Sequence, residues 1–355
     1  MVRDGVSVKL RLRTGIDTCN DPLWEQLVNE LDSDVFHAPA WHRVLRDTYG
    51  FTPEAAVLLD PGDRPAAGMS VCLIEDVRGR RIVSMPFSDY CDPLVEDDSQ
   101  WQPVSSEFLR LSPVLKLRCR RSTAPVDDER FEKTGRARWH GVTILPTGEE
   151  AWQRVDGSAR RAVTKAQRAG VTVTRVCDGQ GVRAFYDLHL AVRKYKYGLL
   201  AQPFRFFESI SANFLTRNQG VLLLAHFGER TIGGVLLLRW KDRLYYKFNA
   251  SYAPGLEHRP NDLLMWSAIE YARETGCELL DLGLTDWDQE GLIRYKRKYA
   301  DLEGEISFLE RKGAPQAHHV AAGPLIGELS QLLAGPTVPD SVTEEGGNLL
   351  YRYFA

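Results

Sequence analysis

GVLLLAHFGERTIGGVLLLRWKDRLYYKFNAS, residues 220–251, is the stretch that decides the fold. Its three runs are rich in leucine, valine and aromatic residues and are bounded by glycine and charged turn residues, which predicts a meander of strands. A helical pattern at 261–276 and a strand pattern at 277–283 follow. A meander followed by a helix and a strand predicts an α+β fold with a mixed sheet. The three runs are 220–228, 230–241 and 242–251.

The first half of the chain repeats a shorter version of this order. Two helical patterns, DPLWEQLVNEL and APAWHRVLRDTYG, precede several strand patterns, and the second helix has Pro39 near its start and Gly50 past its end. We therefore expect two similar domains, residues 1–145 and 146–313. The tail, residues 314–355, ends in GGNLLYRYFA. We expect it to dock on the body of the protein, because a free end rarely carries so many aromatic residues.

Composition limits the partners and the compartment that we expect for this protein. The chain has 355 residues, of which 43% are hydrophobic. Its formal net charge is −3, so no global positive field attracts nucleic acid. A nucleic-acid partner would need a local basic patch. Its 6 cysteines are scattered without CxxC spacing, which is typical of reduced thiols. The N-terminus has no apolar stretch after its charges, and no window reaches the roughly 18 apolar residues of a membrane span, so we expect a soluble, cytoplasmic protein.

Motifs for metal or covalent chemistry are missing from the sequence. It contains no GxSxG elbow, HExxH pair or P-loop lysine motif, and its 8 histidines show no ligand spacing. We therefore expect no metal ligands and no cofactor. The remaining type of active site is one that acts by positioning its substrates and by electrostatic stabilisation.

Residues 159–170, ARRAVTKAQRAG, predict a helix with one basic face. Arg161, Lys165 and Arg168 stand at i, i+4 and i+7. A solvated helix face and an anion-binding surface both fit this pattern.

Aromatic residues alternate with cations in VRKYKYG, residues 192–198, at the end of a long helical pattern. Arg193 and Tyr197 lie four apart on one side of the last turn. The helix dipole favours cations there in any case, but the interleaved tyrosines favour a surface for phosphate or sugar. Tyr245 and Tyr246 point to opposite faces of a strand, so we expect one in the core and the other facing a cleft.

A second basic helix is predicted at residues 291–300, GLIRYKRKYA, where Lys296 and Tyr299 share a face. A lysine held between aromatic rings beside an anionic ligand keeps its proton and can stabilise developing negative charge. A purely structural amphipathic helix is the alternative. The four cations are Arg294, Lys296, Arg297 and Lys298.

Two loops are further candidates. Asn261 is a candidate N-cap for the helix at 261–276. In MPFSDYCDPL, residues 85–94, Ser88, Asp89, Tyr90 and Asp92 gather at a strand end, where sites often occur. An ordinary Pro/Asp turn fits equally well.

The order of these pieces resembles the Fem-type aminoacyltransferases and their relatives with a GNAT-fold, BioF2-like acetyltransferase domain. The matching stretches are FHAPAWHRVL, SARRAVTKAQRAGV, LHLAVRKYKYG, IGGVLLLRWKDRLYYKFNASY, RPNDLLMWSAIEYARETGCELLDLG, GLIRYKRKYADLEG and LYRYFA. The resemblance implies two tandem GNAT-like domains with a cleft between them. The second is catalytic, and the tail returns to the N-terminal domain. No long coiled-coil arm is present in the sequence, which implies a compact variant.

Members of that family transfer an aminoacyl group from aminoacyl-tRNA to an amine, on a cell-wall precursor or in natural-product synthesis, without a metal or a covalent enzyme intermediate. The resemblance implies that Arg193 and Tyr197 grip the acceptor's phosphates and that Tyr295-Lys296 meets the aminoacyl-tRNA end. Implied further acceptor contacts are Tyr245, Tyr246 and Tyr90. Implied further donor contacts are Arg294, Arg297 and Asn261.

Three hypotheses follow for function. In the first, Lys296 steadies the oxyanion of aminoacyl transfer from tRNA, while Asp281 and Asp286 are candidate bases, although Asp281 is better suited to bracing the loop. In the second, an acyl-CoA-dependent N-acyltransferase uses acetyl-CoA as donor. Against it, EHRPNDLL (257–264) lacks the glycine loop that binds pyrophosphate, and Pro260 removes a backbone donor. In the third, the protein binds ligands without catalysis. The acceptor and the oligomeric state stay open.

Overall fold

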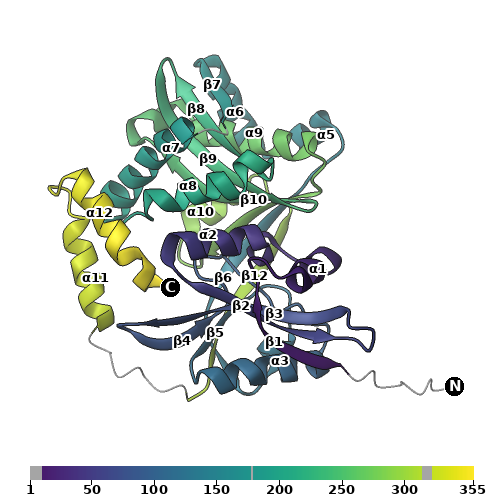
Figure 1. Cartoon of the computed structure of the whole chain (residues 1–355). Helices are drawn as coiled ribbons and strands as arrows, with labels where there is room; N and C mark the ends of the chain where they lie inside the picture. Colours follow the sequence, from purple (N-terminus) through teal and green to yellow (C-terminus); the bar gives the residue numbers. More distant parts are fainter. Residues whose placement is uncertain (1–9, 177–178, 314–321) are drawn as a thin grey trace. The chain divides into compact units, whose positions relative to one another are not determined.

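The structure is a computed structural model of the chain that describes residues 10–176, 179–313 and 322–355. It divides into two compact units (Figure 1). Unit 1 consists of residues 1–136 and 306–319, and unit 2 consists of residues 137–305 and 320–355.

Unit 1 contains a six-stranded run in the order β1-β2-β3-β4-β5-β12. The first four strands pair antiparallel, β4 pairs parallel to β5, and β5 pairs antiparallel to the end of β12. The strands are β1 (Arg11–Asp17), β2 (Thr52–Leu59), β3 (Pro65–Asp76), β4 (Gly79–Val83), β5 (Leu115–Cys119) and β12 (Leu302–Arg311). The helices are α1 (Pro22–Glu30), η1 (Val35–His37), α2 (Pro39–Tyr49), α3 (Asp98–Leu111) and α4 (Ala124–Asp127).

Unit 2 contains the order β6-β11-β10-β9-β8-β7. Here β7 to β10 form the antiparallel meander, β10 pairs parallel to β11, and β11 pairs antiparallel to β6. The strands are β6 (Phe131–Thr143), β7 (Val171–Val176), β8 (Gly220–Phe227), β9 (Arg230–Trp240), β10 (Arg243–Ser251) and β11 (Leu279–Asp286). The helices are α5 (Gly148–Arg154), α6 (Gly157–Arg168), α7 (Gly179–Ala191), η2 (Val192–Lys196), α8 (Phe204–Asn213), η3 (Leu215–Arg217), η4 (Ala253–His258), α9 (Pro260–Glu274), α10 (Glu290–Lys296), α11 (Ala322–Leu333), α12 (Asp340–Leu350) and η5 (Tyr351–Phe354).

The two units share one chain order. In each, four antiparallel strands are followed by a long helix, α3 or α9, and then by a strand that pairs parallel to the fourth. The predicted α+β class with two similar domains and mixed sheets is confirmed. Among the described residues no helix extends into a coiled-coil arm, and none is long and apolar enough to cross a membrane.

The unit boundaries differ from the predicted 1–145, 146–313 and 314–355. Strand β6 already belongs to unit 2 from Ala137, because residues 137–143 hydrogen-bond to β11. In return, the end of β12 completes unit 1 by pairing with β5. Local sequence could not show that β6 and β12 each contribute residues to both units, since each strand is one uninterrupted pattern in the sequence.

The described tail, 322–355, belongs to unit 2 rather than to the N-terminal unit on which we expected it. Asp340 of α12 accepts hydrogen bonds from Lys194 Nζ at 2.6 Å and from the Tyr195 hydroxyl at 2.7 Å. Glu344 pairs with Arg183 of α7 at 3.1 Å. Charge pairing with α7 and η2 therefore holds α12, in addition to the aromatic end of the chain.

Two adjacent glycines of β9 show why helices cover both faces of the unit 2 sheet. A Cβ atom on Gly233 would lie 3.2 Å from Leu264 of α9, whereas one on Gly234 would lie 2.8 Å from Phe185 of α7. Because neighbouring strand residues point to opposite faces, α9 and α7 pack on opposite sides, as Figure 1 also shows. Both helices can therefore pack closely on the sheet, because glycine has no side chain at these two positions.

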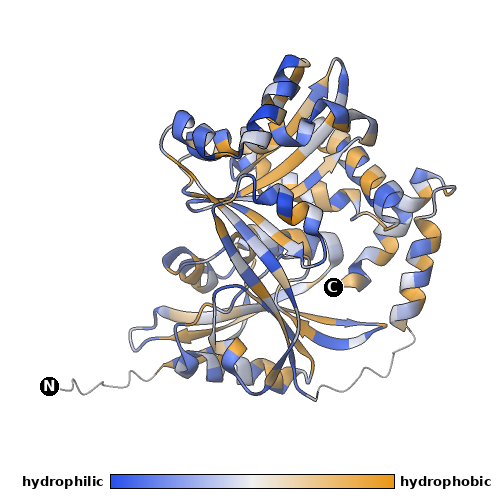
Figure 2. Cartoon of the chain, turned by 180° about the vertical axis from the view of Figure 1, so that it is seen from behind, coloured by the Kyte–Doolittle hydropathy of each residue, from blue (hydrophilic) through white to orange (hydrophobic). Residues whose placement is uncertain are grey.

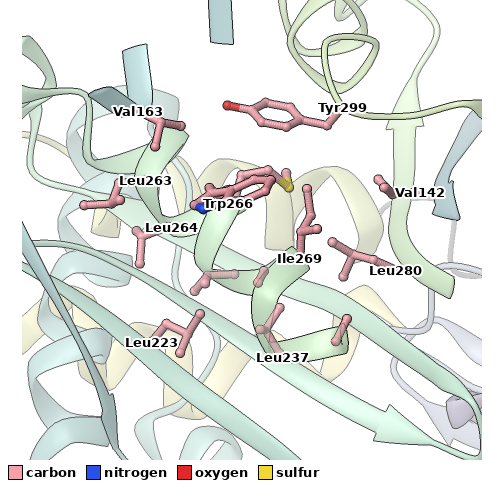
Figure 3. Close-up of a cluster of buried hydrophobic side chains, with 14 of the residues drawn as sticks. Val142, Val163, Leu223, Leu237, Leu263, Leu264, Trp266, Ile269, Leu280 and Tyr299 are labelled. Atoms are coloured by element: carbon pink, nitrogen blue, oxygen red, sulfur yellow. The ribbon is translucent and has the colours of Figure 1, made fainter. Parts of the chain in front are cut away.

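The main core of unit 2 lies under α9. Trp266, Leu264 and Ile269 of this helix meet strand residues such as Leu237 and Leu280 (Figure 3). Figure 2 shows the same division, with apolar strands inside and polar residues on the outer helix faces.

We expect Gly234→Ala to lower the free energy of unfolding by about 1–3 kcal/mol, because the added methyl group would crowd Phe185 and Leu224. Urea unfolding measures the change. Gly327→Ala in α11 is the matched control, since nothing lies within 4 Å of its added Cβ. Equal stability of the two variants would contradict the close approach of α7 to β9.

Candidate active site

The site of unit 2 begins where two strands part. Strands β10 and β11 pair in parallel only over 243–245 and 279–281, and beyond these residues no pairing between them continues. The register of β10 against β9 also slips between Tyr246 and Phe248. A pocket of about 700 Å³ is lined by the residues that follow on both strands. Its lining comprises Lys196, Tyr197, Tyr246, Asn249, Asn261, Met265, Leu282, Asp288, Gln289, Glu290, Gly291, Leu292, Tyr295 and Lys296.

Lys296, the predicted catalytic residue, lines this pocket and is 6% exposed. Its Nζ donates to the backbone carbonyl oxygens of Gly283 at 3.1 Å and Leu284 at 3.2 Å. Gly283 has a φ of 65°, and its N–H donates to Asp281 Oδ1 at 2.7 Å. The irregularity of β11 between Asp281 and Leu284 therefore presents two carbonyl groups to the lysine, and the ammonium group is held at the pocket wall.

A chain of polar groups joins α10 to the start of α9. The Tyr295 hydroxyl donates to the Asn261 carbonyl oxygen at 2.9 Å, and Asn249 Nδ2 donates to the Tyr246 hydroxyl at 3.0 Å. Ser251 donates to Asn261 Oδ1. Burial raises the pKa values of the phenols of Tyr246 and Tyr295 above the ordinary range, so both remain protonated. The wall of the pocket is thus polar but uncharged here.

The N-terminus of α9 is poorly suited to binding an anion. Arg259, not Asn261, is the N-cap and has a φ of 60°, so the predicted N-cap role of Asn261 is wrong. Pro260 follows and has no N–H to offer. Asp262, 7% exposed, accepts a hydrogen bond from the Tyr299 hydroxyl at 2.8 Å. A carboxyl group therefore occupies the helix end at which GNAT proteins bind pyrophosphate.

The pocket rim carries charges that the sequence analysis did not single out. Lys196 supplies a cation beside Tyr197, while Asp288 and Glu290 supply carboxylates from the loop after β11. All four side chains are exposed. The acidic loop could have been found from its place after a strand end, but nothing in the sequence indicated that Lys196 faces it.

Several predicted site residues lie elsewhere. Arg193 of the π-helical turn η2 donates to the Leu200 carbonyl oxygen at 3.0 Å. Tyr245 is 2% exposed, with Tyr246 taking the pocket side of β10. Neither Arg193 nor Tyr245 lines the pocket.

Three further predicted contacts are also placed away from the pocket. Tyr90 is fully buried in unit 1, where its ring packs against Phe36 with centroids 5.4 Å apart. Arg297 pairs with Glu303 through two hydrogen bonds of 2.5 and 2.9 Å, and Arg294 lies exposed on the outer side of α10. Spacing alone could not separate these cations from Lys296, which of the four cations in residues 294–298 is the one that lines the pocket.

The two candidate bases are not placed for proton transfer in the pocket. Asp281 is 1% exposed and accepts a hydrogen bond from Trp139 Nε1 at 2.7 Å as well as from Gly283, so it braces the loop. Asp286 ends β11 and is not part of the pocket lining.

Residues 153–297 match the family model described as an acetyltransferase (GNAT) domain. This segment is therefore similar to GNAT acetyltransferase domains. The lining residues of the pocket all lie within it.

Solved structures extend the likeness beyond that segment. FemX aligns with a TM-score of 0.61 at 13% identity, over 80% of this chain and 95% of FemX. The C-terminal domain of a putative lysylphosphatidylglycerol synthetase from Agrobacterium fabrum aligns with a TM-score of 0.55 at 14% identity, over 86% and 96% of the two chains. A tandem GNAT protein from the clavulanic acid biosynthesis pathway gives 0.54 at 10% identity, over 85% and 98%.

These likenesses confirm the resemblance to Fem-type proteins at the level of the fold. No curated protein sequence matches the chain. The match to a GNAT domain model and these structural neighbours support an acyl-transfer enzyme.

Burial raises the pKa of the Asp262 carboxyl above its ordinary 3.8, so the folded protein holds this proton more tightly than the unfolded chain does. The free energy of unfolding therefore falls as pH rises from 3.8 through the raised pKa, and the loss persists at higher pH. We expect Asp262→Asn to be more stable than the wild type at about pH 7, with the gain shrinking towards about pH 4. Urea unfolding across this range measures it, and a gain independent of pH would contradict the buried carboxylate.

Proposed function

We propose that the protein transfers an aminoacyl group from aminoacyl-tRNA to an amine and forms an amide bond. The observation that carries this proposal is the pocket beside the parted strands β10 and β11, with the buried Lys296 in its wall and an acidic rim. Amines on cell-wall precursors or on natural-product intermediates are the acceptors that we propose.

The start of α9 favours this donor over acyl-CoA. A pyrophosphate at a helix N-terminus needs backbone N–H groups and a positive local potential. Here Pro260 removes one N–H group, and the buried Asp262 places a carboxyl group in the first turn. An aminoacyl ester of tRNA needs no pyrophosphate site there, so the closed helix end does not hinder it.

The acidic rim suits the charge of an amine. Asp288 and Glu290 line the mouth of the pocket, opposite in charge to an ammonium group. The α-ammonium group of an aminoacyl ester carries this charge, whereas an acetyl group does not. The rim therefore gives the pocket a means to select aminoacyl donors.

In the proposed reaction the neutral acceptor amine attacks the ester carbonyl carbon. A C–N bond forms while the carbonyl electron pair moves to the oxygen, which the Lys296 ammonium group stabilises electrostatically. Collapse breaks the ester C–O bond and releases the tRNA ribose hydroxyl, which takes up the proton lost by the amine. Lys196 and Tyr197 at the rim hold the acceptor. We propose no metal or organic cofactor for these steps.

We expect Lys296→Met to lower the rate of aminoacyl transfer by about 100- to 1000-fold, because the positive charge next to the developing oxyanion is lost. The assay follows a radiolabelled aminoacyl group from tRNA to cell-wall precursor peptides and small amines. Lys296→Arg, which keeps the charge, should retain part of the rate. Lys312→Met removes an exposed lysine of unit 1 and is the control. Wild-type rates in folded Lys296→Met would refute the role of this lysine.

The acidic rim is tested by binding. We expect the wild type to bind aminoacyl-tRNA more tightly than deacylated tRNA, and Asp288→Asn/Glu290→Gln to lose most of that preference because the attraction for the ammonium group is gone. Aminoacyl-tRNA with an N-acetylated amino group is the matched ligand control, since its amine carries no charge. If the double variant still prefers aminoacyl-tRNA over deacylated tRNA, the rim does not recognise the ammonium group.

A further inference from the structure

Helix α6 carries a basic groove outside the pocket. The groove has a volume of about 660 Å³ and is lined by Arg160, Arg161, Lys165 and Arg168 together with Gly157, Thr164 and Trp152 of α5. Figure 2 shows the helix as a largely hydrophilic ribbon. Four cations thus face one hollow, which is a larger local charge than the net charge of −3 suggests.

None of these four cations pairs with a carboxylate among the described residues. Other arginines of unit 2 do: Arg154 pairs with Asp301, Arg175 with Glu274 and Arg297 with Glu303. The groove therefore concentrates cations that the protein itself leaves uncompensated.

Helix energetics does not account for this arrangement. The dipole favours Lys165 and Arg168 in the last turn of α6, but it does not favour Arg160 and Arg161 near the start. Like charges at i and i+4, as in Arg161 and Lys165, destabilise a helix. An external polyanion would offset this repulsion.

The groove is connected directly to the helix that carries Lys296. The N–H of Asp156, the N-cap of α6, donates to the Lys298 carbonyl oxygen at 2.9 Å, two residues beyond Lys296. The buried face of α6, Ala159, Val163 and Ala166, belongs to the same core cluster as Leu264 of α9. Its outward face is therefore held in a fixed relation to the pocket.

We propose that the α6 groove binds the sugar–phosphate backbone of a tRNA stem. The cations from Arg160 to Arg168 extend over about 12 Å of helix axis, a length over which a nucleic-acid duplex carries several phosphates. The stem of a tRNA lies a few nucleotides from its ester-bearing 3′ end, so its phosphates need a site beside the pocket rather than in it. This inference rests on the proposed tRNA donor and adds where the body of the donor binds.

The test compares two double variants that remove the same charge. Arg161→Gln/Lys165→Gln changes the groove, while Arg205→Gln/Arg217→Gln removes two exposed cations from α8 and η3. Binding of bulk deacylated tRNA is measured against salt concentration, with the unfolding midpoint of each variant as a check on folding. Acetyl-CoA binding is measured in parallel.

We expect the groove variant to lose at least about tenfold in tRNA affinity at low salt, and its log–log salt slope to flatten by about 1.4–1.8, as two lost phosphate contacts require. The control variant should bind like the wild type, and acetyl-CoA binding should not change. Equal losses in both doubles, or loss of acetyl-CoA binding alone, would overturn the assignment.

Failure of this inference is distinguishable from failure of the proposed function. If the wild type binds tRNA and the groove variant binds it equally well, only the groove assignment falls. If the folded wild type binds no tRNA at any salt, the donor and the groove assignment both fall. If the groove variant alone loses tRNA but Lys296→Met transfers at the wild-type rate, the groove stands and the mechanism falls.

Discussion

The site depends on how briefly β10 and β11 pair. Three residues of each strand form parallel hydrogen bonds, and then the strands part while α9 packs across them. The backbone groups beyond the pairing need other partners, and Lys296 takes two of the carbonyl groups. The pocket, the buried cation and the polar network at α9 all follow from this early end of the ladder.

A lysine held by carbonyl oxygens is a compromise between stability and function. Burying an ammonium group is costly unless it is hydrogen-bonded, and Lys296 donates hydrogen bonds to the Gly283 and Leu284 carbonyl oxygens. The neighbouring Asp281 accepts hydrogen bonds from Trp139 and from the Gly283 N–H, which keeps these carbonyl groups in place.

Charge is divided among three surfaces of unit 2. The pocket rim is acidic at Asp288 and Glu290, the wall carries Lys296, and α6 carries uncompensated cations. Such a division suits a donor with a cationic amino group at one end and a polyanionic body at the other. The closed start of α9, with Pro260 and Asp262, argues against the compact phosphates of CoA at that helix end.

Much of the fold followed from the sequence, because local patterns encode it. The apolar meander at 220–251 and the helix after it predicted the α+β class, and the shorter repeat of this order in the first half predicted two similar domains. Their GNAT-like character was implied by the resemblance to a known family. Alternation along β10 required that Tyr245 and Tyr246 face opposite sides. Only the tertiary structure decided which of them lines the pocket, since that depends on where β10 parts from β11. It also paired Arg193 with the Leu200 carbonyl oxygen and brought Lys196 to the rim. The exchange of β6 and β12 between the units is likewise a tertiary property, because hydrogen bonds between distant strands are not encoded in the local residues of either.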